Sequence, residues 1–90
     1  MEDRIILGST IKCTAGRDKD KLFVVVSQID SLYVAIADGK SRKVQRPKMK
    51  KIKHCTFHKI PDEDILNRLE ECCLTNSVLR KHLAEYVKEE

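Results

Sequence analysis

The run of residues 22–26, with the sequence LFVVV, constrains the fold more than any other part of the chain. Its β-branched and aromatic side chains favour a strand, in which alternate residues point to opposite faces. Leu22, Val24 and Val26 then lie on one face, and Phe23 and Val25 lie on the other, so both faces need cover. A chain of 90 residues has room for one domain. We therefore expect the interior of a small barrel to bury one face and a separate element of the same domain to bury the other.

Further strand and turn signals surround this run. The turn-prone pairs Asp30-Ser31 and Asp38-Gly39 separate apolar segments and predict two hairpins. Pro47 has no amide hydrogen to donate, so we expect the chain to leave the sheet there. Strands are expected at residues 9–13, 22–26, 33–37, 41–45 and 52–57.

The hydrophobic period changes from two residues to about three and a half after Ile60. Pro61 and the three acids that follow it are typical of a helix start, where the positive end of the helix dipole favours carboxylates. The capping sequence Thr75-Asn76-Ser77 predicts a second helix. The expected buried positions are Ile65, Leu66, Leu69, Cys72 and Cys73, then Val78, Leu79, Leu83, Tyr86 and Val87.

These signals together predict a mainly β fold with α. A small β-barrel over residues 1–59 is followed by a C-terminal helical hairpin over residues 60–90. The hairpin is the element available to cover the second face of residues 22–26. We expect it to pack on the barrel, so that the two parts form one compact unit.

The charge of the chain is unevenly distributed. The 18 Lys and Arg residues against 14 Asp and Glu residues give a net charge of only +4. Residues 1–59 carry 14 basic and 6 acidic side chains, net +8, whereas residues 60–90 carry 4 and 8, net −4. Residues 40–53 concentrate eight cations and contain no acid. Such a dense cationic segment favours an anionic polymer as the partner.

A glycine-containing loop ahead of the apolar strand gives the most specific sequence pattern. The sequence CTAGRDK at residues 13–19 precedes FVVV at residues 23–26, and shorter motifs (ID, YV, ADG, RKV and KH) follow. Over about residues 8–56, these motifs resemble the bacterial KOW-domain RNA-binding proteins, small relatives of the KOW-bearing large-subunit ribosomal proteins of archaea and eukaryotes. The resemblance implies an SH3-like barrel and a ribosome-associated protein that binds ribosomal RNA, with ribosomal proteins as further partners.

The resemblance also assigns roles within the first loop. It places Gly16 at the glycine of the motif, where the loop turns with a backbone conformation that is costly for other residues. Asp20 stands where family members often have a second glycine. Because Asp tolerates the left-handed region better than most residues, we expect the turn to survive this departure.

We expect the cations of the loops and strand rim to contact RNA phosphates. Arg42 and Arg46 carry planar guanidinium groups that suit bidentate contacts, and the lysines act as point charges. Aromatic residues are few, which favours folded, duplex-containing RNA over single strands. The first loop is expected to extend the surface of the basic segment. The candidate RNA-binding residues are Arg17, Lys19, Lys21, Lys40, Arg42, Lys43, Arg46, Lys48, Lys50, Lys51 and Lys53.

Three alternatives remain open at this point. The basic segment can be a solvated loop that only aids solubility. The protein can be an interaction module in translation or transcription, docking through the barrel or the acidic helical tail. Charge alone also allows DNA, because phosphate contacts carry no information about the sugar.

No motif for catalysis, metal binding or membrane insertion is recognisable. Cys13, His54, Cys55 and His58 lack the paired short spacing of structural zinc sites, and no phosphate-binding loop or catalytic carboxylate pair is present. We therefore expect no enzymatic activity, metal, cofactor or small-molecule substrate. The longest apolar runs have five residues, against roughly 20 for a membrane span, and the N-terminus lacks the features of a secretory signal. These features predict a cytoplasmic protein with reduced cysteines.

Overall fold

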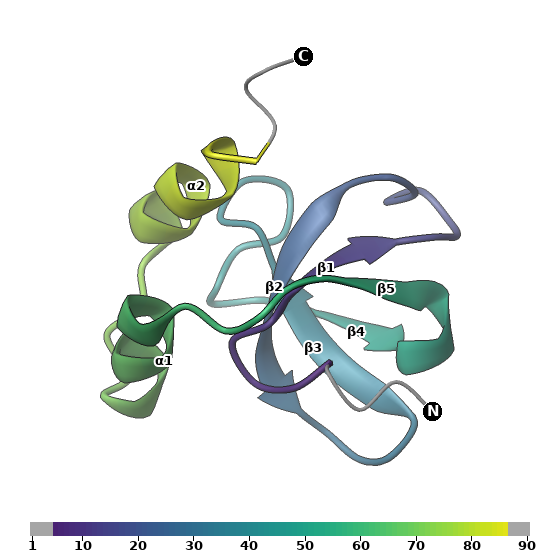
Figure 1. The fold of residues 1–90 in the computed structure, drawn as a ribbon, viewed down its shortest axis with the longest axis horizontal. Coiled ribbons are helices and arrows are strands. Elements are labelled where there is room, and N and C mark those ends of the chain that lie inside the picture. The colour runs from purple at the N-terminus through teal and green to yellow at the C-terminus, as the bar shows by residue number, and fades with distance from the viewer. Residues whose placement is uncertain (1–4, 87–90) are drawn as a thin grey trace.

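Five antiparallel strands form one sheet, and two helices lie on one side of it (Figure 1). The computed structural model describes residues 5–86. Their elements are β1 (Thr10–Cys13), β2 (Leu22–Gln28), β3 (Tyr33–Ala37), β4 (Lys48–Lys51), the 3₁₀ turn η1 (Ile52–His54), β5 (Cys55–Lys59), α1 (Glu63–Glu70) and α2 (Asn76–Ala84). The strand order across the sheet is β4-β3-β2-β1-β5. The fold is mainly β with α, as the sequence predicts.

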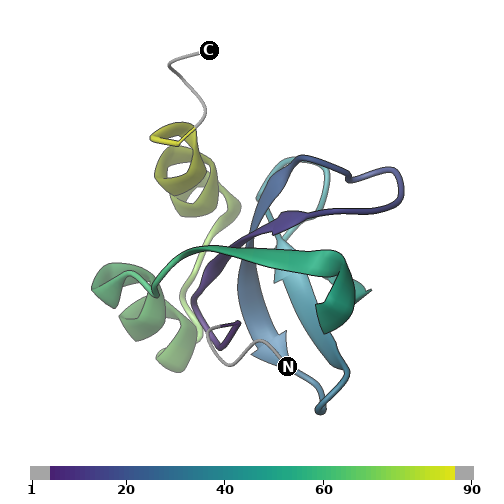
Figure 2. The same ribbon diagram turned by 45° about the vertical axis from the view of Figure 1, so that its right-hand side comes forward.

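The central strand β2 is buried on both faces. Phe23 and Val25 point into a sheet-side core, together with Ile11, Cys13, Val34, Ile36 and Cys55. Val24 points the other way, into a helix-side core that contains Ala37, Ile65, Leu74, Leu79 and Leu83. Both helices lie on this second side of the sheet (Figure 2). The prediction that the helical hairpin covers the second face of residues 22–26 is confirmed.

The sheet is bent but not closed by strand pairing. The register shifts between Val25 and Ser27 where β2 pairs with β3, and between Thr10 and Ile11 where β1 pairs with β5. Such bulges bend a sheet locally and increase its twist. The strands β4 and β5 are its two edges, and within residues 5–86 no pairing joins them. The strand pairs of this part of the chain therefore form an open sheet.

The predicted strand at residues 41–45 is wrong. This segment is a loop of turns, and β4 pairs with β3 in its place. The carboxylate of Asp38 accepts the amide hydrogens of Lys40 and Arg42 at 2.9 and 2.8 Å, which bonds these amides outside a sheet. Pro47 also acts opposite to expectation, because the chain enters the sheet directly after it. A proline just before an edge strand removes no bond from the ladder.

Other strand boundaries also differ from the sequence prediction, and β2 extends to Gln28, two residues beyond the expected end. The last strand was expected at residues 52–57, but the chain forms η1 first and β5 then runs from Cys55 to Lys59. The amide of Ile52 donates to the carbonyl of Leu32 at 2.8 Å, which holds this turn against the end of the β2–β3 hairpin. The first strand begins at Thr10, one residue later than expected.

Both helices start where the sequence predicts. The Asp62 carboxylate accepts the amides of Asp64 and Ile65 at 3.1 and 3.2 Å, and the Thr75 hydroxyl accepts the amide of Val78 at 3.2 Å. These side chains bond amides that have no partner inside their helices. Neither helix in residues 5–86 is long and apolar enough to cross a membrane.

The predicted buried stripe of the first helix is wrong at Cys72 and Cys73. The helix ends at Glu70, and Cys72 adopts a φ of 57°, in the left-handed region that terminates helices. Both cysteines are therefore exposed, and Leu74 enters the helix-side core instead. Val87, which was also expected to be buried, lies outside the described residues.

The variant Leu79→Ala tests whether the helices complete the core. Leu79 is fully buried on the helix side, so the truncation leaves a cavity, and we expect the free energy of unfolding to fall by about 2–5 kcal/mol. Ile60→Ala is the control, because the Ile60 side chain is 69% exposed, and it should change this energy by less than about 0.5 kcal/mol. Equal unfolding energies of the two variants in urea titrations would contradict this description of the core.

Candidate nucleic-acid interface

The cations that the sequence singles out lie in two loops, one edge strand and the turn that follows this strand. They come from the β1–β2 loop (residues 14–21), the β3–β4 loop (residues 38–47), β4 and η1. We call this set the basic rim. It consists of Arg17, Lys19, Lys21, Lys40, Arg42, Lys43, Arg46, Lys48, Lys50, Lys51 and Lys53.

Two side-chain hydrogen bonds hold the β1–β2 loop to the basic segment. Lys50 Nζ donates to the carbonyl of Ala15 at 3.2 Å, and Arg42 Nη2 donates to Asp18 Oδ2 at 3.1 Å. Asp18 is buried, with a side chain only 5% exposed, so its carboxylate depends on Arg42 as a charge partner. The first loop therefore does lie against the basic segment, although the two are separated by more than twenty residues in the sequence.

Arg42 and Lys50 therefore hold the β1–β2 loop in place, a structural role that the sequence does not reveal. Arg42 Nε is buried without a hydrogen-bond partner among the described residues, and its Nη2 is engaged by Asp18. Lys50 is half-buried. Both residues were predicted as phosphate contacts, and their bonds to Asp18 and Ala15 also make them braces that hold the β1–β2 loop to the β3–β4 loop and to β4.

The β1–β2 loop turns at the two predicted positions. Gly16 has a φ of 81° and Asp20 has a φ of 69°, both in the left-handed region. A Cβ at Gly16 would lie 3.3 Å from Lys50 Nζ, so the glycine also leaves room for the brace. The amide of Asp20 donates to the carbonyl of Cys13 at 2.8 Å, which closes the turn. The expectation that Asp20 sustains a left-handed turn is confirmed.

Helix α2 fixes the β3–β4 loop from the other side. Asn76 Oδ1 accepts the amide of Val44 at 2.7 Å, and Asn76 Nδ2 donates to Gln45 Oε1 at 2.9 Å. Arg80 Nη1 donates to the carbonyl of Gly39 at 2.6 Å. Gly39 has a φ of 78°, and a Cβ there would collide with the backbone of Asn76. From the sequence, Asn76 was predicted only as a capping residue and Arg80 was not singled out, because their bonds join residues more than thirty positions apart.

The lysines of β4 alternate between the faces of the sheet. Lys48 and Lys50 pair with Ile36 and Val34, and so lie on the side of the sheet-side core. Both are half-buried, and their alkyl stems can cover the edge of that core. Lys51 lies on the opposite face and is exposed. The basic rim therefore wraps around an edge strand and does not form one flat patch.

The exposed cations have different surroundings. Lys51 and Lys53 border a hollow of about 450 Å³ whose lining contains no acid. Lys21 and Lys40 border a second hollow, of about 620 Å³, together with the carboxylates of Asp20 and Asp38, which weaken its attraction for anions. The remaining exposed cations make no ion pair with another residue of 5–86, and they are Arg17, Lys19, Lys43 and Arg46.

The cysteines and histidines considered for zinc do not gather around a common point. Cys13 and Cys55 are cross-strand neighbours, but residues 5–86 contain no group of three His, Cys, Asp or Glu side chains that could hold a metal. The ring of His58 instead meets that of Tyr86 edge-on, with the centroids 5.5 Å apart. Contact with the Cys13 thiol and burial both raise the pKa of Cys55, whose Sγ donates to the carbonyl of Lys51 at 3.4 Å.

Evidence for the role of the basic rim comes from the chain itself. The sequence matches no protein-family model and no curated protein sequence. The KOW resemblance of residues 8–56 therefore stays a prediction. Function has to be inferred from the exposed cations and from the contacts that hold their loops.

The variant Asn76→Ala tests whether α2 holds the β3–β4 loop. Alanine keeps the helix but removes the acceptor of the Val44 amide, a bond worth about 1 kcal/mol, so we expect this amide to exchange its hydrogen about fivefold to tenfold faster. Ser77→Ala, at the next and exposed position of α2, is the control. Unchanged exchange at Val44 in Asn76→Ala, measured by NMR, would contradict the anchoring role.

Proposed function

We propose that this protein binds structured RNA without catalysing a reaction, that its target is ribosomal RNA, and that it acts on the ribosome. The observation that carries the proposal is the pair of braces, Arg42 to Asp18 and Lys50 to Ala15, which joins the β1–β2 loop to the β3–β4 loop and to the edge strand β4. Gathering like charges opposes folding through self-repulsion. A phosphate backbone relieves that repulsion and releases counterions when it binds.

In this proposal the open sheet corresponds to an SH3-like barrel of the KOW type. The left-handed φ of Gly16 in the β1–β2 loop supports this assignment, as does the order of the strands. The phosphate contacts fall to the exposed cations of the basic rim, because Arg42 and Lys50 are engaged by the protein itself. Arg17 and Arg46 are then the exposed guanidinium groups that suit bidentate contacts.

The acidic helix α1 favours a one-sided contact with RNA. Residues 60–90 carry a net charge of −4, and the first turn of α1 contains Glu63 and Asp64. Both helices cover the side of the sheet opposite to the sheet-side core (Figure 2). RNA is therefore attracted to the basic rim and repelled from the acidic start of α1, which orients the protein on its target.

A protein partner in translation or transcription is the second candidate. Leu32 and Met49 are 62% and 55% exposed, and Met49 lies on the edge strand β4. An edge strand can accept an added strand from another protein. The lysines of β4 (Lys48, Lys50 and Lys51) disfavour such pairing. A protein partner therefore has less support than an RNA partner.

The variants Lys43→Glu and Arg46→Glu, each made alone, test the proposed interface. Each reverses an exposed charge on the β3–β4 loop, so we expect weaker binding to ribosomal RNA fragments and a salt dependence (log Kd against log salt) lower by roughly one per lost phosphate contact. Lys81→Glu makes the same charge change on α2 and should have a smaller effect. Wild-type affinity that does not respond to salt, or equal losses in all three variants, would refute the proposal.

A further inference from the structure

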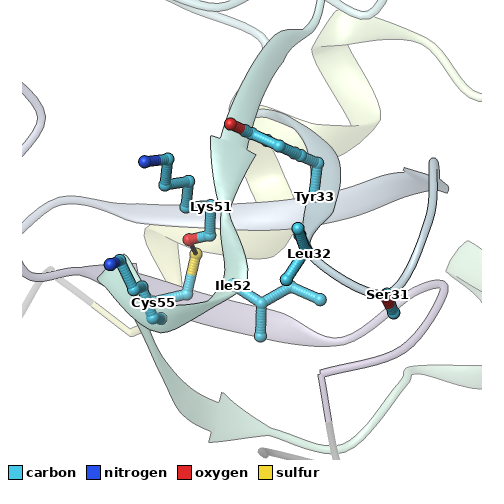
Figure 3. A pocket seen from close by; sticks show the side chains of 7 residues that line it. Ser31, Leu32, Tyr33, Lys51, Ile52 and Cys55 are labelled. Carbon is cyan, nitrogen blue, oxygen red and sulfur yellow. Dashed lines mark hydrogen bonds between the residues drawn. The ribbon is translucent and has the colours of Figure 1, made fainter.

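A hollow of about 450 Å³ opens between the end of the β2–β3 hairpin and the turn after β4 (Figure 3). Its walls include the aliphatic side chains of Leu32 and Ile52 and the ring of Tyr33. Lys51 and Lys53 also line it, and both are exposed. The hollow thus combines an apolar interior with cations at its border, and none of its lining residues is acidic.

Hydrogen bonds to backbone amides hold the walls of this hollow in place. Asp30 Oδ1 accepts the amides of Leu32 and Tyr33 at 2.8 and 2.9 Å, so the Asp30 carboxylate is turned toward the backbone. The amide of Ile52 donates to the carbonyl of Leu32 at 2.8 Å and joins the two walls. Preformed walls reduce the ordering cost of binding.

The lining residues match the two parts of a nucleotide. An aromatic ring and aliphatic side chains suit the flat face of a base, while ammonium groups suit a phosphate. Tyr33 and Lys51 are paired across β3 and β4 and their side chains point the same way (Figure 3), so one residue could meet each part. The volume of about 450 Å³ is within the range of roughly 300–1,000 Å³ typical of small-ligand sites.

We infer that this hollow takes one unpaired nucleotide of the bound RNA, with its base against Leu32 and Tyr33 and its phosphate beside Lys51 and Lys53. The inference rests on the proposed RNA-binding function and adds a preference within it. Phosphate contacts alone bind any duplex, whereas a base-sized hollow selects a helix with an unpaired residue. Leu32, which is 62% exposed, loses its contact with water when the base enters.

The test compares an RNA hairpin that carries one unpaired adenosine in its stem with the same stem fully paired. We expect the wild-type protein to bind the first about tenfold more tightly, because stacking on an aromatic side chain adds to the phosphate contacts. Tyr33→Leu and Leu32→Ser should reduce the preference to about twofold or less while the paired stem binds as before. Met49→Ser is the control, because Met49 is 55% exposed but does not line the hollow, and it should keep the preference.

The possible outcomes distinguish the proposed nucleotide site from the proposed RNA-binding function. Equal, salt-dependent binding of both hairpins would overturn the nucleotide site and leave the proposed RNA-binding function intact. Binding of neither hairpin at low salt would overturn both. As a second readout that does not depend on affinity, the Leu32 methyl NMR signals should shift with the bulged hairpin and not with the paired stem. A shift with an acidic peptide and none with the bulged hairpin would assign the hollow to a protein partner and refute the inference.

Discussion

Burial of β2 on both faces is the constraint on which the rest of the structure depends. A strand with Phe23 and Val25 on one side and Val24 on the other cannot form the surface of a sheet. The sheet therefore bends to enclose the first side, and the helices must cover the second. The acidic C-terminal segment thus completes the core of this 90-residue chain. Small domains have difficulty building such a core.

The same packing positions the candidate interface. Because α2 lies against β2, its first turn reaches the β3–β4 loop, and Asn76 binds the amide of Val44. On the other side of that loop, Arg42 reaches the buried carboxylate of Asp18. The β3–β4 loop, which carries much of the basic charge, is held by contacts on two sides. These contacts fix the backbone positions of its cationic residues. Such preorganisation would reduce the entropy lost in the proposed binding of RNA.

Features of the sequence that depend on neighbouring residues could be predicted. The two-faced strand, the change of hydrophobic period after Ile60, and the caps at Asp62 and Thr75 all follow from local patterns, and the structure contains them. The strand expected at residues 41–45 failed, because Asp38 and Asn76 bond its amides from outside the segment. The predicted burial of Cys72 failed for a different reason, because this residue adopts a left-handed conformation that ends α1 and redirects the chain.

Part of the candidate site could also be predicted from the sequence, and part could not. Its cations could be named from the charge pattern, and Gly16 from the loop motif. The use of Arg42 and Lys50 as braces could not be predicted, because Asp18 and Ala15 are distant in sequence and carry no signal for the pairing. The hollow beside Tyr33 was missed as well. Its walls come from the end of the predicted hairpin and from the 3₁₀ turn Ile52–His54, which was expected to be part of a strand.

The proposed role of the basic rim is to bind ribosomal RNA. The most direct measurement is sedimentation of the full-length protein with purified large ribosomal subunits over a series of salt concentrations. The protein should pellet with the subunits in moderate salt and be released progressively as salt is raised, because each phosphate contact is weakened by competing ions. Protein that remains in the supernatant in moderate salt, or that pellets equally at all salt concentrations, would contradict the claim.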